Sequence, residues 1–151
     1  MIDPALRERI RVAHAQNDYT ALLALIPYAT LIGIQCRRED EGVLYCLPAK
    51  RGNIGNPLLP ALHGGVIAGF MELAAALHLM LFTDTGQVPK IIDFSIDYLR
   101  AGLYRDTYAR CQLWRQGRRV TNVAITAWQA SVGEPIATAR AHFKIDEHTA
   151  P

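Results

Sequence analysis

One acidic side chain stands in the middle of an apolar segment. Glu72 lies inside residues 63–82, HGGVIAGFMELAAALHLMLF, whose other side chains are nearly all apolar or small. A helix that is apolar on every side is normally buried, and a carboxylate is rarely buried without a partner, because removing its charge from water is costly. Glu72 therefore indicates either a partner elsewhere in the molecule or a chemical task, such as accepting a proton or attacking an electrophile.

The same segment begins with residues that leave the backbone open. Its first residues are His63-Gly64-Gly65, and glycines at a helix start leave the first N–H groups unobstructed at the positive end of the helix dipole. Such donors suit an anion, or an oxyanion that forms during a reaction. One predicted helix thus carries two reactive features.

The helix positions around Glu72 hold small residues. A helical period places four of them three and four positions before and after it: Ala68, Gly69, Ala75 and Ala76. They leave room for an acyl or aryl group beside the carboxylate. They also let the helix approach a sheet or a second helix closely, and the two interpretations are compatible.

Composition bounds the rest of the molecule. The 151 residues are 50% hydrophobic, which suits one globular domain over 1–151 with a sizeable core. The net charge of +2 gives no indication of nucleic-acid or membrane binding. The charged N-terminus lacks the apolar stretch of a signal peptide. The three dispersed cysteines are typical of small apolar residues on strands in a reducing compartment, so we expect a cytoplasmic protein.

The apolar helix must also be tested as a membrane span. Residues 66–82 number about seventeen, the lower limit for crossing a bilayer. Glu72 and His78 are both unfavourable in hydrocarbon, and no basic cluster lies close outside either end. We therefore expect a core helix and no membrane.

Hydrophobic periodicity predicts further elements around this helix. The N-terminal helical segment, 1–27, is interrupted at Asn17-Asp18, which favours two short helices, and is expected to end at Pro27. Residues 50–62, rich in Gly, Asn and Pro, predict a loop that leads into the central helix. Apolar or alternating runs predict strands over 31–36, 42–48, 92–98, 104–115, 119–130 and 135–145.

The last four of these strands follow the helix in sequence. After Asp84-Thr85-Gly86 the period changes to two, with Phe94 and Ile96 on one face and Asp93 and Asp97 on the other. Short turns between the later strands favour an antiparallel meander. The simplest packing is an α+β domain, one curved sheet wrapped around one buried helix.

Taken in order, these motifs resemble one known family. Residues 62–65, Leu-His-Gly-Gly, the acidic Glu72 nine positions after the His, residues 93–100, DFSIDYLR, and the alanine-rich final strand are similar to the hotdog-fold acyl-CoA thioesterases of the phenylacetate-degradation (PaaI) type. The resemblance covers nearly the whole chain, and His-Gly-Gly with its acidic residue is the specific part. It implies a curved antiparallel β-sheet around a long central helix, acyl-CoA thioesterase activity, and a homodimer or homotetramer.

The resemblance also implies roles for individual residues. Glu72 is expected to act as the nucleophile or as the general base for water, and the Gly64 N–H to polarise the thioester carbonyl. From their positions on the predicted helix, and not from the resemblance, Gly65, Ala68 and Ala76 are expected to line the substrate site. Coenzyme A enters as part of the substrate, with no separate cofactor.

Helix geometry limits how Gly64 and Glu72 can work together. They are eight residues apart, so their backbones are separated by about 12 Å. Side chains lean toward the helix N-terminus, but a Glu recovers only part of that gap. A site that uses both groups must therefore take Gly64 from one subunit and Glu72 from another, as in the family's two-fold dimers. A monomer is expected to be inactive.

The sequence departs from the family's pattern at several positions. Many members place a water-holding Ser or Thr where this chain has Ala76 and Ile91. Several place an Asn or Gln six residues before the His, where this chain has Pro57. Asn56, one residue earlier, either assists with the carbonyl or water, or serves as a turn-former before the proline.

Three further residues are candidates for the site. A histidine titrates near neutral pH and suits catalysis, although His63 in this family more often fixes the loop against the helix start. Arg118 and Arg119, at a predicted turn, suit the phosphates of CoA; the commoner explanation for such charges is a solvated sheet edge. No His, Cys and carboxylate cluster has the spacing of a metal site, so we predict no metal.

Two other functions are compatible with the same fold. One is a non-catalytic acyl-CoA sensor, favoured by the missing Ser or Thr. The other is a hotdog dehydratase or hydratase, which needs a His paired with a carboxylate; His63 lies on the wrong element for that pairing. The leading prediction is hydrolysis of an acyl-CoA to a carboxylic acid and CoA.

Overall fold

The computed structural model describes residues 3–83 and 88–145. Its helices are α1 (Pro4–Gln16), α2 (Thr20–Leu23), α3 (Pro27–Ile32) and the long α4 (Gly64–Phe82). The strands of the main sheet are β1 (Gln35–Glu39), β2 (Gly42–Leu47), β5 (Lys90–Tyr98), β6 (Thr107–Gln116), β7 (Val120–Trp128) and β8 (Ala137–Lys144). Between β2 and α4 lie a 3-10 turn, η1 (Arg51–Asn53), and the short strands β3 (Ile54–Asn56) and β4 (Ala61–Leu62).

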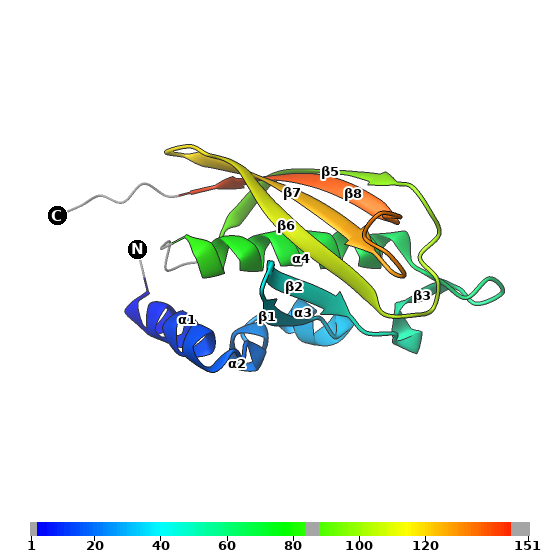
Figure 1. Cartoon of the computed structure of the whole chain (residues 1–151), viewed down its shortest axis with the longest axis horizontal. Helices are drawn as coiled ribbons and strands as arrows, with labels where there is room; N and C mark the ends of the chain where they lie inside the picture. Colours follow the sequence, from blue (N-terminus) through cyan, green and yellow to red (C-terminus); the bar gives the residue numbers. More distant parts are fainter. Residues whose placement is uncertain (1–2, 84–87, 146–151) are drawn as a thin grey trace.

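The main sheet packs against one side of α4. Its six strands are in the order β1-β2-β6-β7-β8-β5, and all neighbours are antiparallel. In Figure 1, α4 lies between this sheet and the three N-terminal helices. The predicted α+β architecture, an antiparallel sheet around a long central helix, is confirmed.

The predicted four-strand meander is correct only for β6, β7 and β8. β5 pairs with β8, from Lys90 opposite Lys144 to Tyr98 opposite Ala137, and so lies at the sheet edge. Residues 99–106, between β5 and β6, are too many for a tight hairpin turn. This connection carries the chain across the sheet, which the preference for pairing sequential strands did not anticipate.

Other local predictions need correction. Pro27 does not end the helical segment; it begins α3, because proline fits the first turn of a helix. Residues 31–32 therefore belong to α3 and not to a strand, and Gly33, at φ 84°, ends that helix. Residues 50–62 are not only loop, since they contain η1 and the β3–β4 pair. The turn expected at Asp84-Thr85-Gly86 lies outside the described residues.

The core forms where α4 meets the sheet. Phe70, Met71 and Ala74 are completely buried, and the inward side chains of β8 are mostly alanines, which let the helix approach closely. The helix is long and apolar enough to cross a membrane, with a mean hydropathy of 1.8. However, 56% of that stretch is buried inside the protein, as expected for a core helix.

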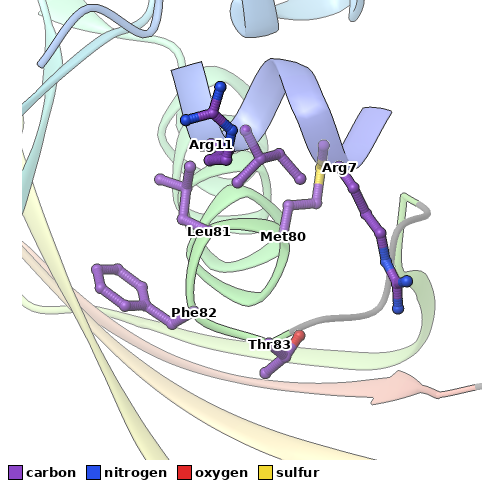
Figure 2. Close-up of a pocket in the computed structure, with 7 residues that line it drawn as sticks. Arg7, Arg11, Met80, Leu81, Phe82 and Thr83 are labelled. Carbon is purple, nitrogen blue, oxygen red and sulfur yellow. The ribbon is translucent and has the colours of Figure 1, made fainter. Parts of the chain in front are cut away.

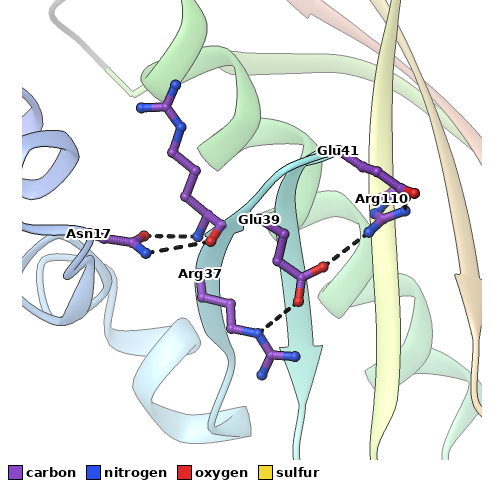
Figure 3. Close-up of polar contacts among 6 residues, drawn as sticks. Asn17, Arg37, Glu39, Glu41 and Arg110 are labelled. Carbon is purple, nitrogen blue, oxygen red and sulfur yellow. Dashed lines mark hydrogen bonds and ion pairs between the residues drawn. The ribbon is translucent and has the colours of Figure 1, made fainter.

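Ion pairs join the β1–β2 hairpin to β6 (Figure 3). Glu39 accepts hydrogen bonds from Arg37 and Arg110, both at 3.0 Å, and Arg110 also pairs with Glu41. The hydrogen bond from Arg37, followed by that from Arg110, lowers the pKa of Glu39. Because all of these groups are partly or largely exposed to solvent, they fix the hairpin's position more than they stabilise the fold.

The three cysteines lie on strands, as predicted. Cys36 is in β1, Cys46 in β2 and Cys111 in β6, and all are free thiols. Burial raises the pKa of Cys36 to about 12 and that of Cys46 to about 11, and also raises that of Cys111. These thiols are therefore poor nucleophiles at neutral pH.

His78, near the end of α4, is a titratable group that the fold partly encloses. Its Nδ1 lies 3.3 Å from the Tyr45 hydroxyl, and its ring packs 4.6 Å from that of Phe82. Burial lowers the pKa of His78 from 6.5 to about 4. Above pH 6.5 the imidazole is neutral in both the folded and the unfolded chain. Between pH 4 and pH 6.5 the unfolded chain binds a proton that the folded chain does not.

The free energy of unfolding should therefore fall as the pH is lowered from about 6.5 to about 4. His78→Asn keeps a polar atom near the place of Nδ1 and removes the titration. Urea unfolding of both proteins at each pH measures the effect. Equal slopes for the two proteins across this range would contradict the assignment to His78.

Candidate active site

The first turn of α4 leaves one backbone donor free. His63 is the N-cap residue, and its Nδ1 accepts a hydrogen bond of 2.9 Å from the N–H of Gly65. The N–H of Gly64 has no hydrogen-bond partner within residues 3–83 and 88–145. His63 therefore organises the helix start, and the Gly64 N–H is the donor available to a ligand.

Tyr98 fixes this helix start against the edge strand. Its hydroxyl, at the end of β5, donates a 2.7 Å hydrogen bond to the carbonyl oxygen of Gly64. A Cβ at Gly64 would lie 3.3 Å from that hydroxyl oxygen. Sequence reasoning missed this contact, although the alternation of β5 placed Tyr98 on the same face as Phe94 and Ile96.

Asn53 and Gly55, which precede the helix in sequence, also hold His63 in place. The backbone carbonyl of the buried Asn53 accepts a 2.9 Å hydrogen bond from the His63 N–H, and the Asn53 side chain donates to the carbonyl of Ile32. A Cβ at Gly55 would lie only 2.7 Å from the Cα of His63. Sequence reasoning missed both roles, because they depend on how β3 packs against the cap.

Glu72 lies two turns further along α4, on a face that the main sheet does not cover. It is partly exposed, as are Ala68 and Gly69, and its carboxylate has no hydrogen bond or ion pair within the described part of the chain. The expectation of a fully buried Glu72 is therefore wrong for a single chain. The sheet covers only the other side of α4, which leaves this carboxylate accessible.

The small residues around Glu72 divide into two groups. Ala75 and Ala76 are 0% and 8% exposed and belong to the core, so they leave little room for a ligand. Ala68 and Gly69 lie on the open face, one turn before Glu72. A helical side chain leans toward the N-terminus, so the carboxylate extends over the open group.

Comparison with known families identifies the chain. A model of the thioesterase superfamily matches residues 59–136, more than half of the sequence, including the helix cap and Glu72. The chain belongs to the thioesterase superfamily. Membership confirms the hotdog fold and the expectation of a thioester-hydrolase family, whereas the PaaI type stays a prediction. No curated protein matches the chain.

Solved structures support the membership of this thioesterase-superfamily chain. A Chromobacterium violaceum protein is 38% identical, with a TM-score of 0.76 over 93% of this chain and 98% of that one. A Bacillus halodurans protein solved with CoA is 20% identical, with a TM-score of 0.72 over 95% and 92%. A phenylacetic acid degradation-related protein from Ralstonia eutropha is 22% identical, with a TM-score of 0.69 over 80% and 90%. The last two show the fold alone.

The remaining candidate residues, Asn56, Arg118 and Arg119, do not lie together. The side-chain oxygen of Asn56 accepts hydrogen bonds from the backbone N–H groups of Leu58 and Leu59, at 3.0 and 3.3 Å, which is its turn-forming role. Arg118 and Arg119 follow β6 at its far end (Figure 1). A strand of that length spans roughly 30 Å, so one chain does not bring these arginines to the helix cap.

A separate cavity lies at the opposite end of α4 (Figure 2). It has a volume of about 290 Å³ and lies between α1 and the last turn of α4, with Arg7 and Arg11 on its wall. Cations near a helix C-terminus are stabilised by the helix dipole.

No group of three His, Cys, Asp or Glu in the described ranges could hold a metal ion.

The close approach at Gly55 can be tested directly. Gly55→Ala should lower the free energy of unfolding by about 1–3 kcal/mol, because the added methyl group meets the backbone of His63. Gly52→Ala is the matched control, since its nearest neighbour would be the flexible Lys50 at 3.9 Å. Denaturant unfolding compares the two, and equal stabilities would show that the cap does not need Gly55.

Proposed function

We propose that the protein is an acyl-CoA thioesterase of the PaaI type. The observation that carries the proposal is a pair of groups on one helix that have no partner among the described residues, the Gly64 N–H at its start and the Glu72 carboxylate further along. A thioester needs one group to stabilise its oxyanion and another to activate water. The Bacillus halodurans neighbour solved with CoA supports CoA as the ligand of this fold.

In the general-base route, Glu72 accepts a proton from water as the water oxygen forms a bond to the thioester carbon. The carbonyl oxygen becomes an oxyanion, which the Gly64 N–H stabilises. When the carbonyl re-forms, the C–S bond breaks and the CoA thiolate takes the proton held by Glu72. In the alternative route Glu72 attacks the carbonyl itself and water then hydrolyses the anhydride; a single turnover in ¹⁸O water would label Glu72 only in this second route.

The proposal requires two copies of the chain. Because Gly64 and Glu72 are about 12 Å apart along α4, one copy supplies the oxyanion donor and the other the carboxylate. In an antiparallel pair of helices related by a two-fold axis near Ala68, Gly64 of each helix is level with Glu72 of the other. Ala68 and Glu72 are partly exposed on this face, so such a partner can contact it there.

The edge strand β5 offers a surface on which this dimer can form. It is nine residues long, has no strand on its outer side in the described sheet, and exposes Ile92 by 58%. A long strand without a neighbour on one side presents unpaired backbone groups that can pair with a further strand. Two copies of β5 paired across a two-fold axis would extend the sheet and set the helices antiparallel. Contact between Arg118 or Arg119 and CoA phosphates would then involve the partner subunit.

Glu72→Gln should lower kcat for hydrolysis of CoA thioesters by about 10²–10⁴-fold, because the amide cannot accept the proton. Release of free CoA, followed with a thiol reagent across aromatic and straight-chain acyl-CoAs, measures the effect. Glu134→Gln, an exposed carboxyl in the turn before β8, is the control and should retain full activity. Gel filtration should show the same oligomer for all three proteins.

Two results would contradict the proposal. Full activity of Glu72→Gln would remove this carboxylate from the reaction. Tight binding of acyl-CoA by the unaltered protein, without release of CoA, would favour the non-catalytic sensor.

A further inference from the structure

A tyrosine from α3 lies against the open face of α4. A Cβ at Gly69 would lie 2.5 Å from the hydroxyl oxygen of Tyr28 and 2.8 Å from Cε1 of its ring. The ring therefore rests directly on the bare backbone of Gly69. Tyr28 is 40% exposed, and its hydroxyl has no hydrogen-bond partner within the described ranges.

This hydroxyl lies on the same face as the Glu72 carboxylate. Gly69 is three residues before Glu72, and side chains at that spacing are neighbours, with Cβ atoms about 5–6 Å apart. The Glu72 side chain leans back over the turn on which the phenol rests. Ala68, on the same face, carries no polar side-chain atom, so Tyr28 brings a hydrogen-bonding group to the surroundings of the carboxylate.

The position of Tyr28 is set by a well-anchored helix. Pro27 begins α3, and Gly33 ends it in a left-handed conformation. Ala29 and Ile32 are buried, at 1% and 2% exposure. The carbonyl of Ile32 accepts a 2.8 Å hydrogen bond from the buried Asn53, the residue that also holds His63. The phenol and the helix cap are therefore fixed by one scaffold.

We propose that the Tyr28 hydroxyl holds the attacking water beside Glu72, an assignment that rests on the proposed function. One O–H of the water donates to the Glu72 carboxylate, which takes that proton in the reaction. The other O–H donates to the Tyr28 oxygen, so that a lone pair of the water faces the thioester carbon. Fixing the water in this way removes part of its orientational cost before the reaction. Gly69 leaves the space that the phenol needs.

Tyr28→Phe separates the hydroxyl from the packing of the ring. It should lower kcat by about 10- to 100-fold with KM changed by less than about threefold, because only the water's position changes. Tyr108→Phe is the control, since Tyr108 stacks on Trp128 at 6.2 Å and alternates with the buried, helix-facing Thr107 and Ala109. If Tyr28→Phe matched the unaltered protein while Tyr28→Ala lost activity, the ring would act only by packing, and the assignment would be wrong.

Gly69→Ala provides a second test from the opposite side of the contact. Its methyl group displaces the phenol, so kcat should fall about as far as in Tyr28→Phe, and combining both changes should cause little further loss. If the two losses in kcat multiplied in the double variant, the proposal would be contradicted. Glu72→Gln, assayed in parallel, separates the two hypotheses. An active Glu72→Gln rejects the proposed function, whereas an inactive Glu72→Gln with a fully active Tyr28→Phe rejects only the role of Tyr28.

Discussion

Gly64 and Glu72 lie on one continuous helix, so helix geometry sets the distance between them. The hydrogen-bonded backbone of α4 keeps them about 12 Å apart, further than a single reacting carbonyl can bridge. The sheet covers one side of α4 and leaves Ala68, Gly69 and Glu72 on the other side partly exposed. This separation and this open face are the reasons why the proposed site needs a second copy of the chain.

The rest of the fold holds the two groups ready. Three contacts from different segments meet at the first turn of α4: Tyr98 on its carbonyl, Asn53 on the His63 N–H, and Gly55 against the His63 backbone. With His63 capping Gly65, they hold the first turn, in which the Gly64 N–H has no partner among the described residues. The apolar side of α4 packs on the alanines of β8, so the helix cannot rotate to hide its carboxylate. Fixed donors of this kind stabilise developing charge without reorganisation.

The sequence predicts the elements of this protein better than their contacts. The apolar run around Glu72 and the alternation through Phe94 indicate α4 and β5 correctly, because periodicity reports which face is buried. It does not report partners, so β5 was assigned to the wrong neighbour. The contacts of Tyr28, Asn53 and Gly55 join segments far apart in sequence, and no local pattern encodes them. Glu72 was expected to be buried because composition cannot show that the sheet covers only one side of α4.

Complementation between two inactive chains tests the shared site most directly. Gly64→Pro removes the N–H and suits the first helix position, since His63 already has the extended conformation, φ −63° and ψ 130°, that precedes proline. Neither Gly64→Pro nor Glu72→Gln alone should hydrolyse acyl-CoA. Random assembly of the two chains makes about half of the dimers heterodimers, and each heterodimer has one intact site out of two. The mixture should therefore recover about a quarter of the unaltered activity. No recovery in a purified heterodimer would contradict a site built from two subunits.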